Sequence, residues 1–442
     1  MDFKESIVRR FELSSGARLL IVPFQDRKAL TIGFWVLTGS AYENPEFLGL
    51  SHFAEHILFK GSKHFSGQQI VSEIERKGGN IDAYTTRQET CYYATVLGED
   101  VETAVSILAD LVSHPLMRDE DIGLERQVIL SEIDEVWDEP EALAQEIFSL
   151  LLFGNSPLGR PIIGTQKTVS RIGRSQLHDY WRTHYVGQNI LVGASGAVEP
   201  TNFAALVEKY LKIPKSSPEF PDTSQVDNKF DCKLVIIPRV SSQVHFFIGS
   251  RTFPYRDERR YVLALLDTIL GRGSASRLFQ IIREKLGLVY NITSFGEYYS
   301  ENGLWATYAA AARNNFPKLL VEILKQFKDI AINLVDENEI SNAKSFLRGR
   351  LLLSSESLWN VLGRAIESEK HLGRFVSLEE TAQKVMEIST EEIRELAIEI
   401  FSPQNLVALA FGDVDGIELP HTELETVVAT VEEICPGNFS FS

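Results

Sequence analysis

Strand-like and helix-like segments follow one another through the first half of this chain. Two apolar stretches rich in β-branched and aromatic residues, ARLLIVPF and ALTIGFWVLTG, end at Pro or Gly and therefore predict strands. The stretch GLSHFAEHILFKGS comes next and has a helical pattern. SGQQIVSEIERKGG predicts a second helix, with Ser66 as its cap and Gly78 and Gly79 at its end.

The rest of this half continues the mixture of strands and helices. NIDAYTTRQETCYYATVLG predicts two strands. VETAVSILADLVSHP and DIGLERQVILSEIDEVWDE predict two longer helices, and NILVGASGAV followed by NFAALVEKYLK predicts a strand and a helix.

A segment rich in Pro, Ser, Asp and Asn, residues 213–229, then interrupts the pattern and predicts a linker. After it a similar order begins again: two strands (KLVIIP, QVHFFIGSRTF), a helix (RRYVLALLDTILG), a strand pair (LVYNITSFGEYY, GLWATYAAAA), several helices and a last strand (NLVALAFG). We therefore predict an α+β fold with two homologous domains, residues 1–212 and 230–442. Each would be a mainly antiparallel sheet covered by helices.

Length and charge narrow the classes of function. The 442 residues are enough for more than one core, and a formal net charge of −17 argues against nucleic acid as a partner. The negative charge favours solubility, and an acidic cavity for basic peptides is the alternative.

No apolar run approaches the roughly 18 residues of a membrane span, and MDFKESIVRRFEL lacks the apolar core of a signal peptide. Cys91, Cys232 and Cys435 form no paired spacing, so we expect a soluble, cytoplasmic protein.

The most informative short motif is HFAEH, which contains His52, Glu55 and His56. Positions four apart share one face of a helix, so the two imidazoles can bind one Zn²⁺. Glu55 lies beside the pair and could take a proton from zinc-bound water. The alternative is two ordinary polar histidines on an amphipathic helix, but the pairing with a Glu favours metal binding. The second half contains no such motif, so we expect one zinc per chain.

A catalytic zinc needs a third protein ligand, and the acidic helix LERQVILSEIDEVWDEP offers several. Its acidic residues are Glu125, Glu132, Asp134, Glu135 and Asp138. Glu125 and Glu132 are seven residues apart and share a face. A solvated acidic face is the alternative, and spacing alone does not choose between Glu125, Glu132 and Glu135.

The stretch around the motif closely resembles the active-site helix of the pitrilysin family of zinc peptidases, in particular its mitochondrial-processing-peptidase-like branch. HxxEH is the inverzincin signature. The resemblance implies that Glu132 is the third zinc ligand and that Glu125 supports the site. SPLGRPIIGT and NILVGASGAV also resemble family segments.

Two further stretches resemble family elements that hold the substrate. GGNIDAYTTRQETCYYA is similar to an edge strand that pairs with an extended peptide. The implied substrate-binding residues are Asn80, Asp82, Ala83, Tyr84 and Thr85, with Asp82 where the family usually has Asn. SRLFQIIREKLGLVY resembles an element whose Arg and Tyr, here Arg283 and Tyr290, help to hold the substrate or its oxyanion. The alternative for this pair is a surface Arg and a core Tyr.

The resemblance implies a zinc endopeptidase that cleaves unfolded peptides or presequence-like segments, with Glu55 as general base. Family members form homodimers, or heterodimers of one active and one inactive subunit; we expect a homodimer first and a heterodimer with a homologous subunit as the alternative. A non-catalytic partner subunit, as in a respiratory-complex-like assembly, is the competing function. Such relatives typically lose part of the metal motif, and this chain keeps all of it. A metal-binding scaffold without catalysis is a third possibility.

Overall fold

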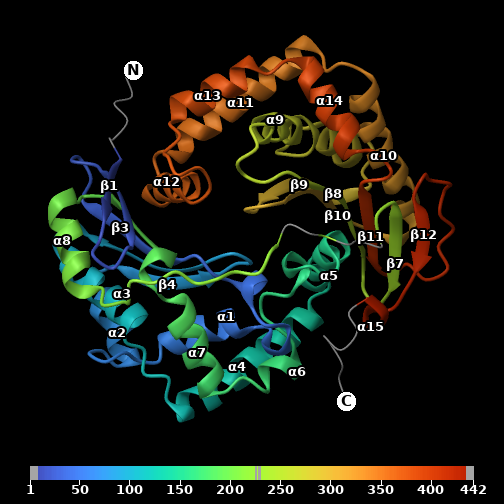
Figure 1. The fold of residues 1–442 in the computed structure, drawn as a ribbon. Helices are drawn as coiled ribbons and strands as arrows, with labels where there is room; N and C mark the ends of the chain where they lie inside the picture. Colours follow the sequence, from blue (N-terminus) through green and yellow to red (C-terminus); the bar gives the residue numbers. More distant parts are fainter. Residues whose placement is uncertain (1–7, 224–225, 227–229, 435–442) are drawn as a thin grey trace. The chain divides into compact units, whose positions relative to one another are not determined.

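The computed structural model of the chain describes residues 8–223, 226 and 230–434 and forms two compact units (Figure 1). The first unit comprises Met1–Ile133, Arg160–Asp222 and Leu353–Ser377. The second comprises Asp134–Gly159, Thr223–Leu352 and Leu378–Ser442. Each unit is built on one sheet, so each can be described separately.

The sheet of the first unit has six strands in the order β1-β2-β6-β3-β5-β4. The strands are β1 (Arg9–Glu12), β2 (Arg18–Pro23), β3 (Ala29–Val36), β4 (Asn80–Thr85), β5 (Thr90–Leu97) and β6 (Ile190–Gly196). β2 and β6 pair in parallel, and the other neighbours are antiparallel. β4 lies at one edge of the sheet, next to β5.

Helices cover both faces of this sheet because the strand residues that face each side are apolar. One face packs against helices that precede the linker: α1 (Leu50–Leu58), α2 (Gly67–Glu75), α3 (Val101–Ser113), α4 (Asp119–Asp138), α6 (Gln166–Val169), α7 (Arg174–His184) and α8 (Pro200–Tyr210). On β3, Ile32 and Phe34 face this side and join Phe53 of α1 in the core. Trp35, the residue after Phe34 on the same strand, faces the opposite side.

The opposite face of the first sheet is covered by a helix from the second half of the sequence, α12 (Leu358–Leu372) (Figure 1). Leu362 and Ile366 of α12 pack on Trp35 and Leu191. The Trp359 ring stacks on Trp35 with 5.8 Å between ring centroids. The first unit therefore includes a helix, α12, that comes after strands β7 to β10 of the second sheet in the sequence.

Five strands of the second sheet repeat the order of five strands of the first. The order of the second sheet is β12-β7-β11-β8-β10-β9, with β7 (Lys233–Pro238), β8 (Val244–Thr252), β9 (Val289–Tyr298), β10 (Gly303–Ala311), β11 (Leu406–Gly412) and β12 (Glu425–Val428). Counted from β2 and from β7, the two sheets share the strand order first, fifth, second, fourth, third. The prediction of an α+β fold with two homologous domains is confirmed, with mixed sheets in which most pairs are antiparallel.

The helices of the second unit also cover both faces of their sheet. They are α5 (Pro140–Phe153), α9 (Arg260–Leu270), a π-helical segment η6 (Phe279–Lys285), α10 (Phe316–Ile332), α11 (Glu337–Ser354), α13 (Leu378–Glu387), α14 (Thr390–Ile400) and α15 (Val431–Ile434). α9 follows β7 and β8 along the chain as α1 follows β2 and β3, but α9 has no HxxEH. α5 packs on β8, where Phe148 stacks on Phe247 with 5.2 Å between centroids.

The compact units differ from a simple division at the linker because two helices are exchanged. α5 precedes residues 213–229 yet belongs to the second unit, and α12 follows them yet belongs to the first. The chain passes between units within α4 and within α11. The predicted boundaries, 1–212 and 230–442, follow the repeat in the sequence and stay a prediction. Each compact unit, in contrast, contains segments from both halves of the sequence.

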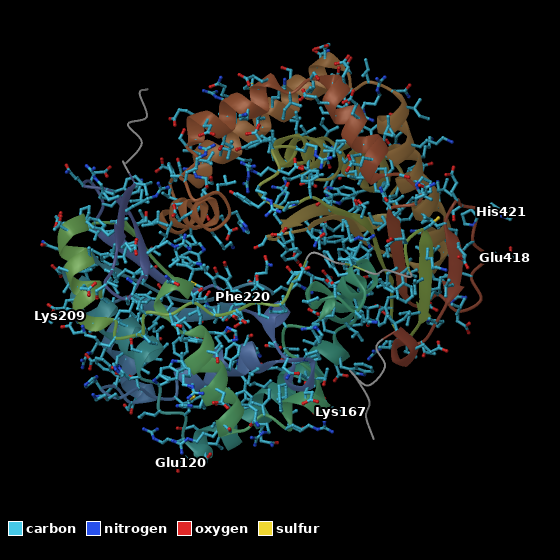
Figure 2. The ribbon with its side chains drawn as sticks, in the orientation of Figure 1. Glu120, Lys167, Lys209, Phe220, Glu418 and His421 are labelled. Atoms are coloured by element: carbon cyan, nitrogen blue, oxygen red, sulfur yellow. The ribbon has the colours of Figure 1, made fainter. Side chains whose placement is uncertain are left out.

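The described part of the predicted linker has no helix or strand and follows the first unit's surface. Phe220, labelled in Figure 2, packs on Tyr42 with 4.3 Å between ring centroids. Residues 224–225 and 227–229 of the linker, and Cys435, lie outside the described residues. Cys91 and Cys232 are free thiols. Among the described residues, every helix is too short or too polar to cross a membrane.

Candidate metal centre

Helix α1 presents the two histidines and Glu55 at the side of the first unit's core. Its other face is fully buried, with Phe53, Ala54 and Ile57 in the core cluster that residues of the sheet and α3 also form. This packing fixes the rotation of the helix, so the polar face must hold His52 and His56. Their rings lie one turn apart, with 4.6 Å between centroids.

Helix α4 brings Glu132 to the histidine pair. The Oε2 atom of Glu132 lies 3.9 Å from Nε2 of His52 and 3.7 Å from Nε2 of His56. Of the candidate carboxylates on α4, Glu132 is the one that groups with both imidazoles. Glu135, which spacing left open, is exposed and outside this group.

These three ligand atoms fit a zinc ion. Ligands in a tetrahedral zinc site lie about 3.4 Å apart when each is about 2.1 Å from the metal, and the two measured separations are close to this. Burial, the largest cause, and the neighbouring His56 lower the pKa of His52 to about 3. His52 is therefore a neutral imidazole with a lone pair available at physiological pH, as metal binding requires.

Glu125 orients His56 from behind. Its Oε2 atom lies 3.1 Å from Nδ1 of His56, so a proton on Nδ1 donates to the carboxylate and leaves Nε2 to face Glu132. The side chain of Glu125 is only 7% exposed, and its other oxygen pairs with Nζ of Lys60 at 2.7 Å. Lys60 thus compensates a buried charge that would otherwise be costly. Sequence analysis assigned Glu125 a supporting role but did not identify Lys60.

Glu55 lies on the same helix face with an altered acidity. Burial, the largest cause, raises its pKa, as do the nearby carboxylates of Asp82 and Glu132, while a hydrogen bond from Thr85 and the proximity of His56 oppose the shift. Oγ1 of Thr85 donates to Oε2 of Glu55 at 2.5 Å. A carboxylate with a raised pKa beside the ligand atoms can accept a proton at neutral pH.

The start of α1 is held by a buried carboxylate that sequence analysis missed. Oε2 of Glu43 accepts from the N–H of Gly49 at 2.8 Å, and Oε1 accepts from the N–H of Ser51 at 2.6 Å. N–H groups at the start of a helix have no acceptor within the helix itself, so a carboxylate outside the helix can accept from them. Burial raises the pKa of Glu43 to about 7, although the hydrogen bonds from Ser51 and Gly49 and the nearby Arg160 oppose the shift. Glu43 lies outside the spacing of any N-cap motif, so no local signal identifies it.

β4 carries the predicted substrate-binding residues at the sheet edge. Thr85 faces α1 through its bond to Glu55, and Tyr84 faces the other side, where its hydroxyl accepts from Nε1 of Trp35 at 3.0 Å. Oδ1 of Asp82 accepts from the N–H of Ala83 at 2.8 Å. Asn80 begins the strand and is exposed. An edge strand has backbone groups free for a further strand, and peptide binding there stays a prediction.

Arg283 and Tyr290 lie in the second unit, near each other. The guanidinium carbon of Arg283 is 5.7 Å from the centroid of the Tyr290 ring and 4.5 Å from that of Phe279. Tyr290 is 83% exposed, so the alternative of a core tyrosine is wrong. A function for this pair toward the substrate stays a prediction.

Comparison with known proteins places this geometry in a family. The family model for insulinase (peptidase family M16) matches residues 22–166, and the model for the peptidase M16 inactive domain matches residues 171–347. A protein of Mycobacterium leprae (strain TN) named an uncharacterized zinc protease is 33% identical over 89% of both chains. The chain belongs to peptidase family M16. A second relative, the uncharacterized zinc protease YmxG of Bacillus subtilis (strain 168), is 28% identical over 91% of this chain and 98% of its own.

Solved structures show the same fold as this M16 chain. A protease from Helicobacter pylori superimposes with a TM-score of 0.84 at 17% identity, over 92% of this chain and 99% of that one. A peptidase M16 inactive domain from Pseudomonas fluorescens has a TM-score of 0.84 at 19% identity, over 94% and 100%. A chain of complex III2 from Candida albicans has a TM-score of 0.78 at 18% identity, over 92% and 96%.

Proposed function

We propose that this M16 chain is a zinc-dependent endopeptidase that cleaves unfolded peptides or presequence-like segments, with Glu55 as general base. The observation that carries the proposal is the convergence of two imidazoles and one carboxylate beside Glu55, a second carboxylate whose pKa is raised. Structural carboxylates seldom need this arrangement, whereas metal-assisted hydrolysis does.

His52, His56 and Glu132 would hold the zinc ion, one per chain. When bound, zinc supplies Lewis acidity toward water and toward the peptide carbonyl. Glu55 would take a proton from the attacking water and deliver it to the leaving amine. Glu125 would keep His56 in the tautomer that leaves Nε2 free.

The substrate in this proposal is an extended peptide that adds to β4 as a further strand. The N–H and C=O groups of the strand edge would pair with the peptide backbone, which makes binding tolerant of sequence. Asn80, Asp82, Ala83, Tyr84 and Thr85 would line this strand, and Arg283 and Tyr290 of the second unit would help to hold the substrate or its oxyanion.

The broader setting is also part of the proposal. We place the protein in the cytoplasm and expect a homodimer, with a heterodimer of homologous subunits as the alternative. The similarity to a complex III2 chain supports the fold alone, but it keeps a non-catalytic partner subunit as the competing function. The complete set of ligand and base residues argues against that competitor.

The test uses the purified, zinc-loaded full chain and an internally quenched, unstructured peptide. A chelator and Glu55→Gln should each remove cleavage, with a loss of roughly 10²–10⁴-fold for the substitution, as general-base catalysis predicts. The variant should keep its zinc because Glu55 is not a ligand. Glu120→Gln, an exposed carboxylate of α4 (Figure 2), is the matched control and should cleave as the wild type does.

Two results would contradict the proposal. Equal cleavage by Glu55→Gln at full zinc content would remove the general base from the mechanism. A zinc-loaded wild type that cleaves no unstructured peptide would instead favour the partner-subunit function.

A further inference from the structure

An ion-pair cluster lies on the α12 side of the first sheet. Nζ of Lys370 lies 2.7 Å from Oε2 of Glu89 and 2.5 Å from Oε1 of Glu367. The side chains of Lys370 and Glu89 are only 14% and 8% exposed. Lys370 and Glu89 are 281 residues apart in sequence, so this contact is specific to the folded first unit.

Glu89 connects Lys370 to the edge strand β4. It ends the turn between β4 and β5, where its carbonyl accepts from the N–H of Thr86 at 2.8 Å. Its Oε1 atom accepts from the hydroxyl of Tyr84 at 3.1 Å, and the same hydroxyl accepts from Nε1 of Trp35. The side chain of Tyr84 on β4 is thereby fixed at its tip by two partners.

Strand geometry connects this cluster with the metal centre. Successive side chains of a strand point to opposite faces. Tyr84 therefore faces α12, and its ring makes an edge contact with Trp359 at 6.3 Å between centroids. Thr85, the next residue, faces α1 and donates to Glu55. A shift of this end of β4 toward or away from α12 would move both the strand edge and the group that holds Glu55.

We infer that Lys370 is a positioning residue that fixes the β4 edge, and through it the register of a bound peptide, from the opposite face of the sheet. This inference rests on the proposed function, in which the substrate pairs with β4. Lys370 pairs with Glu89 and Glu367, and it acts on β4 through Glu89 and Tyr84.

The charge of Lys370 is retained despite its burial. Burial by itself lowers the pKa of the ammonium group, but attraction to Glu89 and Glu367 outweighs it and the pKa is raised. Methionine at this position would keep most of the stem and remove the cation from the buried carboxylate of Glu89, whereas Glu367 is 35% exposed and keeps His371 at 3.4 Å. The carboxylate of Glu89 would be drawn toward water, and Glu89 would release Tyr84.

Hydrogen exchange followed by mass spectrometry tests the inference without any need for activity. Lys370→Met should make the amides of residues 80–85 exchange faster by about tenfold, while amides of α1 keep their rates. Glu369→Gln is the matched control. Glu369 lies on the same helix and pairs with Arg10 at 2.9 Å and Arg18 at 3.6 Å, at the β1–β2 side of the sheet. It should leave the exchange of β4 unchanged.

Kinetics give the second readout. With a long unstructured peptide, Lys370→Met should raise KM by about five- to tenfold and change kcat by less than about twofold, because a misplaced edge weakens strand pairing more than chemistry. A purely structural role would lower the active fraction, and so kcat, with KM unchanged. Tyr84→Phe, which removes only the hydroxyl, should show the same direction if Lys370→Met fails to fold.

The outcomes separate this inference from the proposed function. Unchanged β4 exchange in both Lys370→Met and Tyr84→Phe would overturn the inference, as would equal acceleration in Glu369→Gln. If the zinc-loaded wild type cleaves nothing, the proposed function fails, and the exchange measurement still decides whether Lys370 positions β4.

Discussion

At the scale of single residues, Glu43 is the least expected contributor to the site. It is buried and holds the first turn of α1 through two backbone N–H groups. Its pKa of about 7 lies above the ordinary value of 4.5. The folded protein therefore binds this proton more tightly than the unfolded chain does.

This shift predicts a pH dependence with a definite sign. A raised folded pKa contributes stability that is complete below the unfolded value and is lost as the pH rises through about 7. The free energy of unfolding of wild type minus that of Glu43→Gln should fall by on the order of 1–3 kcal/mol between about pH 5 and pH 8. Urea denaturation of both proteins across this range measures it.

A matched control separates burial from simple loss of charge. Glu46 is exposed in the same loop, so Glu46→Gln should give a difference that is flat with pH. A Glu43 difference that stays flat or rises with pH would show that the buried carboxylate is ionised in the folded state.

Residue-level chemistry was predictable where it follows from spacing. His52 and His56 share a face because they are four apart, and the family resemblance singled out Glu132 from Glu125 and Glu135. Contacts between residues far apart in the sequence could not be predicted from spacing. Glu55 meets Thr85 at a separation of 30 residues, and only the pairing of β4 beside α1 brings them together.

At the scale of elements, the beginning of α1 depends on a close approach of two backbone segments. Gly49, the residue before the helix, has a φ of 91°, a left-handed conformation that favours glycine. A Cβ atom there would lie 2.5 Å from the carbonyl oxygen of Ile163 and 3.0 Å from Cα of Gly164. The SPLGRPIIGT segment thus packs against the start of the metal-binding helix.

We therefore expect Gly49→Ala to lower the free energy of unfolding by about 1–3 kcal/mol, through backbone strain and this contact. Since α1 carries two of the three ligands, zinc affinity should fall as well. Chemical denaturation and a zinc-binding titration measure the two effects. Gly363→Ala, in the middle of α12 with open space around it, should be neutral or stabilising by up to about 1 kcal/mol. Similar stability of Gly49→Ala and wild type would show that the loop can move aside.

Elements with their own local signals were predicted well. The capping box that Ser66 forms with Gln69 begins α2 as expected, and β4 and β5 pair as a hairpin. Sequence analysis assigned no element to residues 140–153, which form α5. This helix is apolar around most of its circumference, so its pattern lacks the polar face that identifies a surface helix.

At the scale of the whole molecule, the exchange of α5 and α12 is the feature that local patterns could not indicate. The apolar residues Leu362 and Ile366 indicate that α12 packs on an apolar surface, but the pattern does not indicate which of the two sheets provides that surface. The repeat of strand order predicted two domains in sequence, and in the structure each half of the sequence supplies one helix to the compact unit built on the sheet of the other half. Neither half of the sequence therefore contains a complete unit.

This arrangement predicts that the first half cannot fold alone. A fragment of residues 1–222 lacks α12, so Trp35, Leu20 and Leu191 would lose their cover and form an exposed apolar face. The isolated fragment should bind a hydrophobic dye and unfold without a cooperative transition. Co-expression with residues 223–442 should restore a stable complex, because α12 is then supplied in trans. Cooperative unfolding of the isolated fragment, with the near-ultraviolet signal of its buried tryptophan intact, would mean that the first sheet does not depend on α12.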